Sequence, residues 1–452
     1  MAPTLSIGAP AHNASPESAS GIQTVTGTVI HTESGWDDPA DSSDPSAPRG
    51  GRIFTHVDIA LADGSTMTVR QSGGTVGDIG MVQIPSPPLL RPGDRVEARV
   101  APFAVGRSSG HSSGTGTGWF VVDVSSLVRS GDAGAPEPVT LPGSDLEKQA
   151  GSPLPVSEPV REIDDGSRPH AEFVRTMTDG GAPLHWGSGC TYIVFDSAGT
   201  THLAGDQEFE IMEQALAQWR DKTASCSYMD FVVEEPRSME VGYDGFNVVK
   251  FREARWCRPA PDGGDEECYA FNAAGLTTLT FIDNPDSKRY GEILDADIEI
   301  NGTERFAISA GGETLAPAGR DLADLANTFT HEAGHFLGLD HACRTAGEPS
   351  RLDHEGKEVP LCAGALLEAT MHPTQDNGET KKASLEQDDI DGACAIHPLA
   401  EDPRRCAPVD LTPERRYCTI APDAAGGSAG DTGSSPLAFA GLLLGAVLLL
   451  RR

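Results

Sequence analysis

The string HEAGHFLGLDH, from His331 to His341, constrains this chain more than any other feature of its sequence. Residues four positions apart lie on one face of a helix, so His331 and His335 can aim imidazole nitrogens at a single point. Gly338 tolerates a positive φ, which lets the chain turn sharply and bring His341 to the same point. Three histidines that leave a fourth coordination position open to water are typical of catalytic zinc. The string therefore predicts one zinc site.

Glu332 directly follows the first of these ligands. Zinc lowers the pKa of a bound water towards about 7, and a carboxylate beside the metal can pass the water's proton to a leaving amine. The five fixed positions of the string coincide by chance on the order of once in 10⁴ sequences of this composition. The alternative, histidines that only satisfy hydrogen bonds along a buried helix, explains neither Glu332 nor Gly338. We therefore expect Glu332 to act as the general base in peptide-bond hydrolysis.

Met371 lies downstream, in the string ATMHP. The pattern HExxHxxGxxH with such a methionine resembles the zinc signature and methionine turn of the metzincin metalloproteases. The strings TFTHEAGHFLGLDH and GEILDADIEIN and the x-Met-x-Pro turn most resemble the matrixins, the family that includes the matrix metalloproteinases, over about residues 183–398. By this resemblance Met371 packs beneath the zinc as an apolar platform and is not a ligand. Taken alone, a methionine is more often ordinary core.

The resemblance implies an α+β fold in which the catalytic domain combines a twisted mixed sheet with an active-site helix and a C-terminal helix. It also implies a zinc-dependent metalloendopeptidase acting on a protein or peptide substrate, whose extended backbone pairs with the edge strand of the sheet. The alternative is a catalytically silent, surface-anchored binding protein that keeps the metalloprotease fold. The intact Glu332 argues against this alternative, because a binding module needs no base beside a metal ligand.

Two features depart from the matrixin pattern. His372 follows the turn methionine, where many relatives have tyrosine or another residue. As a fourth ligand it would close the site, and an exposed loop histidine is the simpler interpretation. Animal matrixins block their zinc with a propeptide cysteine, whereas the first cysteine here is Cys190. The string RRCAPVD around Cys406 faintly echoes that motif, but a disulfide is the default role for Cys406.

Asp295, Asp297 and Glu299 alternate along an apparent edge strand. They could bind calcium or help to hold a substrate strand, although solvated edge charges are the commoner explanation. The histidines that hold the second, structural zinc of animal matrixins have no match in this sequence. We therefore assign one zinc and leave calcium as an alternative.

Alternating apolar runs such as QTVTGTVIH and IFTHVDIAL predict a small all-β domain, a barrel or sandwich of about five to seven strands. It resembles accessory domains that precede bacterial matrixin-like proteases. In the catalytic unit, helices are expected over about 207–220, 321–337 and 384–392, the last with Ser384 as its N-cap. The expected division is a leader remnant or disordered segment (1–21), the all-β domain (22–129), a linker (130–181), the catalytic domain (182–398), a tail with a Gly/Ser spacer (399–435) and an apolar sorting or anchor segment (436–452).

Composition bears on partners and compartment. The net charge is -33 and no Lys/Arg cluster is present, which argues against nucleic acid as a partner. Nine cysteines without a CxxC pair indicate disulfides formed in an oxidising compartment, with short loops between Cys257 and Cys268 and between Cys343 and Cys362. We expect a secreted or cell-surface monomer, although the start lacks the charged and apolar regions of an export leader.

The C-terminal end carries the apolar run PLAFAGLLLGAVLLL, which follows a Gly/Ser spacer and precedes two arginines. The run is shorter than the roughly 20 residues that a membrane-spanning helix needs. It resembles the C-terminal sorting signal of myxobacterial surface proteins, in which a cysteine before the run is the processing site. Cys418 matches that cysteine, which leaves eight cysteines to pair. The tail would then engage a membrane transiently before it is cleaved.

Overall fold

The computed structural model describes residues 23–37, 51–85, 87–104, 117–129, 173–259 and 267–411, which fall in one compact unit. The expected leader (1–21), most of the linker and the part of the tail with Cys418 lie outside these residues. The described part is a mixed α+β structure, mostly sheet with three α-helices. The expected fold class is confirmed at that level.

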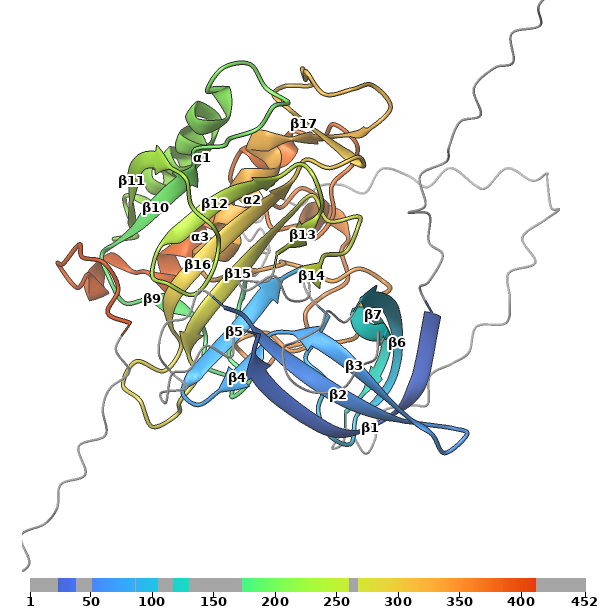
Figure 1. Ribbon diagram of the computed structural model, residues 1–452. Helices are drawn as coiled ribbons and strands as arrows, with labels where there is room; N and C mark the ends of the chain where they lie inside the picture. The colour runs from blue at the N-terminus through green and yellow to red at the C-terminus, as the bar shows by residue number, and fades with distance from the viewer. Residues whose placement is uncertain are drawn as a thin grey trace, which may run out of the picture. The chain divides into compact units, whose positions relative to one another are not determined.

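Five strands of the N-terminal segment close a barrel in the order β1-β2-β3-β7-β6 (Figure 1). Residues such as Val57, Ile59 and Val69 point inward and are buried, as a period of two predicts. Two further strands of this segment, β4 (Gly74–Val76) and β5 (Ile79–Ile84), leave the barrel and join a second sheet. The barrel strands are β1 (Gln23–Trp36), β2 (Ile53–Leu61), β3 (Thr66–Ser72), β6 (Arg95–Ala104) and β7 (Thr117–Val128).

The second sheet has the strand order β11-β10-β12-β16-β15-β5-β4, with β9 paired to the start of β16. Strands β10, β11, β12 and β16 run parallel, whereas β15 is antiparallel to β16 and β5 is antiparallel to β15. The sheet is therefore mixed. Its C-terminal strands are β9 (His185–Trp186), β10 (Cys190–Asp196), β11 (Asp230–Arg237), β12 (Asn247–Arg252), β15 (Gly275–Ile282) and β16 (Glu292–Asn301).

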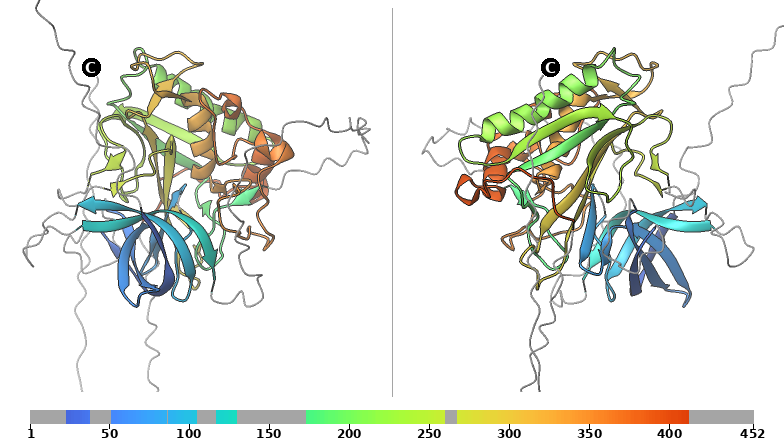
Figure 2. Two further views of the ribbon diagram at one scale, coloured as in Figure 1. Left: turned by 90° about the vertical axis from the view of Figure 1, so that its right-hand side faces the viewer. Right: turned by 60° about the vertical axis from the view of Figure 1, so that its left-hand side comes forward.

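Three helices lie on one side of this sheet, as the two views in Figure 2 show. They are α1 (Gln207–Thr223), α2 (Leu325–Phe336) and α3 (Gln387–Ile396). Their apolar faces share one buried core with the sheet, which includes Trp186 and Phe329. The indole N–H of Trp219 donates to the Thr330 carbonyl oxygen over 3.0 Å and so ties α1 to α2.

Two helix starts differ from the sequence prediction. Helix α2 begins at Leu325, because Asp324 caps it by accepting a 3.1 Å hydrogen bond from the Asn327 N–H. The residues before it form β18 (Asp321–Asp324), which pairs with β17 (Phe306–Ser309). Helix α3 begins after Glu386, whose side chain forms a capping box with Asp389, so the predicted Ser384 cap is wrong.

Four disulfides cross-link the described residues. Those between Cys257 and Cys268 and between Cys343 and Cys362 are the two predicted from spacing. The others join Cys190 to Cys406, which confirms the disulfide role of Cys406, and Cys226 to Cys394.

The remaining elements are short. Strand β8 (Val174–Arg175) lies in the expected linker and pairs with β19 (Leu339–Asp340). Strands β13 (Cys257–Arg258) and β14 (Glu267–Cys268) form a hairpin, and the 3₁₀ turns are Gly364–Leu367, Lys381–Ala383 and Leu399–Glu401.

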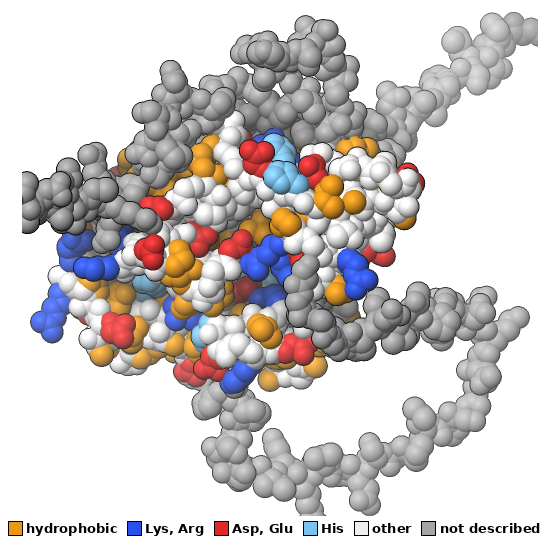
Figure 3. All heavy atoms as spheres, turned by 90° about the horizontal axis from the view of Figure 1, so that it is seen from below, with side chains coloured by type: hydrophobic (Ala, Val, Ile, Leu, Met, Phe, Trp, Pro, Cys, Tyr) orange, Lys and Arg blue, Asp and Glu red, His pale blue; other side chains and the backbone are white. Residues whose placement is uncertain are grey.

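The surface of the described residues has a mixed character. On the face that Figure 3 shows, acidic, basic and apolar side chains are interspersed. No helix among the described residues is long and apolar enough to cross a membrane. The apolar run at 436–452 is not among them.

Candidate metal centre

Helix α2 and the turn after it bring three histidines together. His331 and His335 lie one helical turn apart, with their Nε2 atoms at 3.1 Å. Gly338 ends the helix with a φ of 100°, as predicted, and the chain returns through β19 to His341. The centroid of the His341 ring lies 5.3 Å from that of His331 and 4.8 Å from that of His335. All three side chains are buried, and one candidate ligand atom from each lies within 4.8 Å of the others.

Backbone carbonyls orient two of these rings. Nδ1 of His331 lies 2.6 Å from the Thr370 carbonyl oxygen, and Nδ1 of His335 lies 2.8 Å from the Leu339 carbonyl oxygen. A carbonyl only accepts, so each Nδ1 carries the hydrogen and each Nε2 keeps its lone pair. Two lone pairs 3.1 Å apart repel each other, and a cation between them relieves the repulsion.

Burial keeps the three imidazoles neutral, which is the form that binds a metal. It lowers the pKa of His335 to about 4 and the pKa values of His331 and His341 well below the ordinary value. Three neutral imidazoles with converging nitrogens match the ligand preference of zinc. The residues present therefore fit the predicted metal.

Glu332 turns from α2 towards β15. Its Oε2 accepts a 2.7 Å hydrogen bond from the Thr277 hydroxyl. Burial raises the pKa of Glu332 to about 8, while the Thr277 hydrogen bond and the charge of Lys382 act in the opposite direction. A carboxyl group with a pKa near neutral pH is suited to act first as a general base and then as a general acid.

Met371 packs directly against α2 and is buried. Gly334 lies on this helix between the two histidines, and a Cβ at Gly334 would clash with the Met371 sulfur and lie 3.1 Å from the Trp219 ring. A side chain there would force the helix and the methionine apart. The Met371 carbonyl oxygen accepts a 3.0 Å hydrogen bond from the Ala342 N–H, next to His341. The methionine turn thus contacts both halves of the histidine site.

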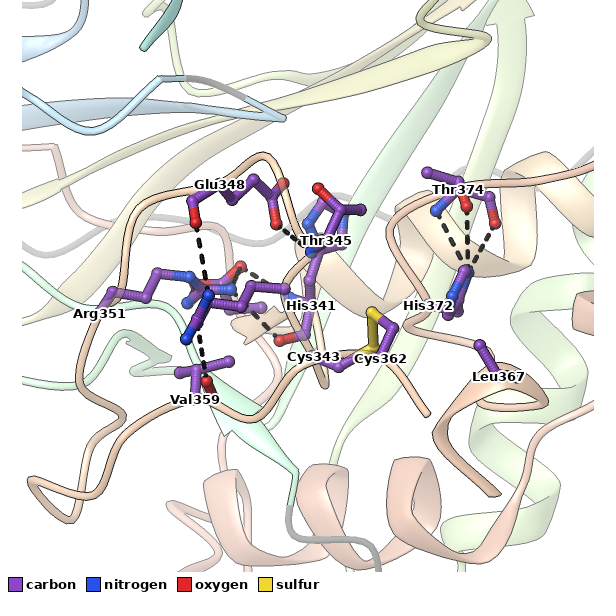
Figure 4. Close-up of a disulfide and its surroundings, with 12 residues drawn as sticks. His341, Cys343, Thr345, Glu348, Arg351, Val359, Cys362, Leu367, His372 and Thr374 are labelled. Carbon is purple, nitrogen blue, oxygen red and sulfur yellow. Dashed lines mark hydrogen bonds and ion pairs between the residues drawn. A yellow bond between two sulfur atoms is a disulfide. The ribbon is translucent and has the colours of Figure 1, made fainter. Parts of the chain in front are cut away.

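His372 is not one of the converging histidines. Its side chain is only 8% exposed, so the interpretation as an exposed loop histidine is wrong. Its Nδ1 lies 2.8 Å from the Thr374 carbonyl oxygen, and its ring lies near the Cys343–Cys362 disulfide (Figure 4). Because these sulfurs are bonded to each other, they are not thiolate ligands. Lys382 is buried, which lowers its pKa to about 8, and its Nζ donates to the His372 carbonyl oxygen over 2.6 Å.

The disulfide between Cys343 and Cys362 closes a loop that begins directly after the third histidine (Figure 4). Within this loop, Arg351 Nη1 lies 2.6 Å from Asp340 Oδ2, and Arg351 Nη2 donates to the His341 carbonyl oxygen over 3.4 Å. Arg351 of this loop therefore contacts both His341 and the residue before it.

Asp295, Asp297 and Glu299 lie on β16, which is an interior strand between β12 and β15. All three side chains are buried, so both the edge-strand placement and the solvated-charge explanation are wrong. They are also absent from the groups of converging metal-ligating atoms among the described residues. Their partners are Arg252 Nε (2.5 Å) and the Tyr269 hydroxyl (2.7 Å) for Glu299, Arg258 Nη2 (3.2 Å) and the N–H groups of Gly242 and Val248 (2.7 and 2.9 Å) for Asp297, and the Gly245 N–H (2.7 Å) for Asp295.

The structure brings every predicted ligand together with Glu332 and Met371, and it adds residues that the sequence did not reveal. Thr277 belongs to an ordinary apolar strand, Gly334 occupies an unspecified position of the string, and Lys382 lies in a polar segment. Only the fold places them beside the histidines. In the comparisons with known proteins, no family model matches this chain, and no curated protein matches its sequence.

Proposed function

We propose that this chain is a zinc-dependent endopeptidase of the metzincin type, similar to the matrixins, that acts on protein or peptide substrates. One observation carries the proposal: the Nε2 atoms of His331 and His335 lie 3.1 Å apart, and His341 and the carboxyl group of Glu332 are buried beside them. The mixed sheet, the helix α2 that bears the site and the C-terminal helix α3 agree with the arrangement that the resemblance implies.

Zinc held by the three histidines would supply Lewis acidity, which lowers the pKa of water and polarises a carbonyl group. Glu332 would take the proton of the attacking water and return it to the leaving amine. Thr277 holds the carboxylate of Glu332 towards β15 through its 2.7 Å hydrogen bond. An extended peptide that pairs with β15 would present its backbone carbonyl groups to the space beside Glu332.

The proposed location is outside the cell or on its surface. Four disulfides within the described residues support it, because such bonds persist in oxidising compartments. We propose one catalytic zinc and a monomer. The proposed processing of the tail at Cys418 concerns residues that the structure does not describe.

The test compares wild type, Glu332→Gln and the control Glu355→Gln, which alters an exposed glutamate of the same type. Each protein is assayed on casein and gelatin with and without a chelator, before and after limited proteolysis, and its bound zinc is measured. We expect one zinc per chain, cleavage that the chelator abolishes, and an approximately 10³-fold loss of kcat/KM in Glu332→Gln alone. Absence of chelator-sensitive cleavage by wild type under both conditions would show that the proposed activity is wrong.

A further inference from the structure

Strand β5 of the N-terminal segment pairs with the edge of β15 that faces away from β16. The two strands pair antiparallel over their whole common length, from Ile84 opposite Thr277 to Ile79 opposite Ile282. The other edge of β15 is occupied by β16. Within the described residues, therefore, both edges of β15 are filled, one of them by a segment far away in the sequence (Figure 1).

The register places the end of β5 beside the histidine site. Thr277, which donates to Glu332, is the residue directly opposite Ile84. Residues directly opposite each other on paired strands share a face of the sheet, so the Ile84 side chain faces α2. It belongs to the same buried core as Ala333 and Met371. The strand then stops at Pro85, which has no N–H group to continue the pairing.

The contact between β5 and the second sheet extends beyond one strand. The Asp283 N–H donates to the Asp78 carbonyl oxygen over 2.8 Å, and Oδ2 of Asp283 accepts a 2.5 Å hydrogen bond from the Thr75 hydroxyl. On the face away from α2, Ile79 and Met81 are buried in one cluster with Tyr243 and Leu294. Backbone pairing, polar anchors and apolar burial thus all hold β5 in place.

An extended peptide that reaches Glu332 by strand addition needs the edge of β15 that β5 fills. A segment of the same chain competes with it intramolecularly, at an effective concentration that the connecting chain sets and that dilution does not lower. We propose that residues 79–84 act as an intramolecular pseudosubstrate: β5 keeps extended peptides away from β15, and it must leave before a substrate can bind. This inference rests on the proposed function, because it assigns β15 as the substrate strand.

The first experiment measures peptide binding without turnover. In full-length Glu332→Gln protein, we would compare Val82→Pro, Gln83→Pro and the control Gln83→Ala for binding of a fluorescein-labelled peptide with the sequence of residues 79–85. Successive N–H groups of a strand point to opposite edges, so one of the two prolines removes a donor to β15. We expect at least a tenfold lower Kd for that proline variant, with Gln83→Ala equal to the parent.

The second experiment does not depend on the proline variants folding. Thr278 and Gln83 are directly opposite each other, so cysteines at these positions should form a disulfide that locks β5 onto β15. We expect mass spectrometry to show this cross-link, and we expect the locked protein to bind no labelled peptide. Failure of the cysteines to join, or undiminished peptide binding by the locked protein, would overturn the inference, as would equal Kd values in folded proline and alanine variants.

Hydrolysis of the labelled peptide by the same variants with Glu332 restored separates the two proposals. If a proline variant binds the peptide tightly but no variant hydrolyses it, the pseudosubstrate stands and the endopeptidase proposal fails. If wild type hydrolyses the peptide as fast as every folded variant and binds it equally well, the endopeptidase stands and the pseudosubstrate fails.

Discussion

Two buried groups of titratable side chains lie on opposite faces of the strands β15 and β16. Thr277 of β15 stands opposite Ile298 of β16, and both belong to the face that packs on α2 with the histidine site. Side chains alternate along a strand, so Glu299 points to the other face, together with Asp297 and Asp295. We call these three residues, with Arg252 and Arg258, the carboxylate cluster.

The two groups differ in how their charges are balanced. Burial acts to raise the pKa of Glu299, but Arg258 and Arg252 outweigh it and lower that pKa below its ordinary value. Burial raises the pKa of Glu332 to about 8, since its nearest partner is the neutral hydroxyl of Thr277. The carboxyl groups of Asp297 and Asp295 also have protein donors as partners, but burial raises the pKa of each, so within the carboxylate cluster it is Glu299 whose charge the arginines balance. The histidine site offers acceptors that face one another, which marks it as the place for an external cation.

The largest effect on stability should come from breaking the carboxylate cluster. Arg258→Met removes a buried cation that lies 3.2 Å from Asp297 Oδ2 and 4.0 Å from Glu299 Oε2, and it leaves Arg252 as the remaining arginine of the cluster. Breaking such a pair lowers the free energy of unfolding by about 3 to 5 kcal/mol. Denaturation in urea measures the change. Arg220→Met is the matched control, because that arginine is exposed and its loss should change the free energy by about 1 kcal/mol at most.

Glu332→Gln tests the opposite expectation for stability on the face that packs on α2. Because burial already disfavours the charged form of Glu332, replacing it with a neutral amide should leave the free energy of unfolding unchanged or raise it. A loss as large as that of Arg258→Met would mean that Glu332 is compensated by the protein. The distinction between the two faces would then be wrong.

Removal of the metal should have the next largest effect. A ligand that binds only the folded state stabilises it by about 2.7 kcal/mol when its free concentration is a hundredfold above Kd. We therefore expect a chelator to lower the free energy of unfolding of wild type by about that amount and to leave His335→Ala unaffected. The chelator should lower it equally in Arg258→Met, because distant sites contribute additively. A chelator effect that disappears in Arg258→Met would show that the metal belongs to the carboxylate cluster.

The difference between the two faces also explains what the sequence could predict. The histidines, Glu332 and Gly338 were predictable because the helical period and one turn glycine fix their positions locally. The carboxylate cluster was misplaced at a solvated edge, because Arg258 and Tyr269 come from a separate hairpin that sequence periodicity does not position. The pairing of β5 with β15 joins segments that no local pattern connects. The sequence thus predicted positions that local geometry fixes, but it did not predict the pairing of distant segments.

A smaller effect should come from the hydrogen bond that positions Glu332. Thr277→Val keeps the size of the side chain but removes the hydroxyl that lies 2.7 Å from Glu332 Oε2. We expect kcat to fall about tenfold, the equivalent of one hydrogen bond to a charged group, with KM nearly unchanged. Both constants are measured by peptide hydrolysis in the proline variant that displaces β5, with and without Thr277→Val. Thr277→Ser should restore kcat, whereas a purely structural role would lower stability and leave kcat intact.

The smallest effect should come from His397, a buried imidazole outside the histidine site. Its Nε2 accepts a 3.2 Å hydrogen bond from the Trp186 N–H, and burial, assisted by His185 and Arg175, lowers its pKa well below the ordinary value. His397 therefore stays neutral in the folded chain, whereas the unfolded chain binds a proton below a pKa of about 6.5, so stability is lost as the pH falls through that value. Between pH 7.5 and 5.5, the free energy of unfolding should fall by about 1 kcal/mol more in wild type than in His397→Gln. Equal pH dependence in the two proteins, measured in the same buffer with the metal present, would show that His397 does not stay neutral. A buried histidine outside the proposed metal site would then take up a proton in the folded chain. Burial alone would not explain why the three histidines of that site stay neutral.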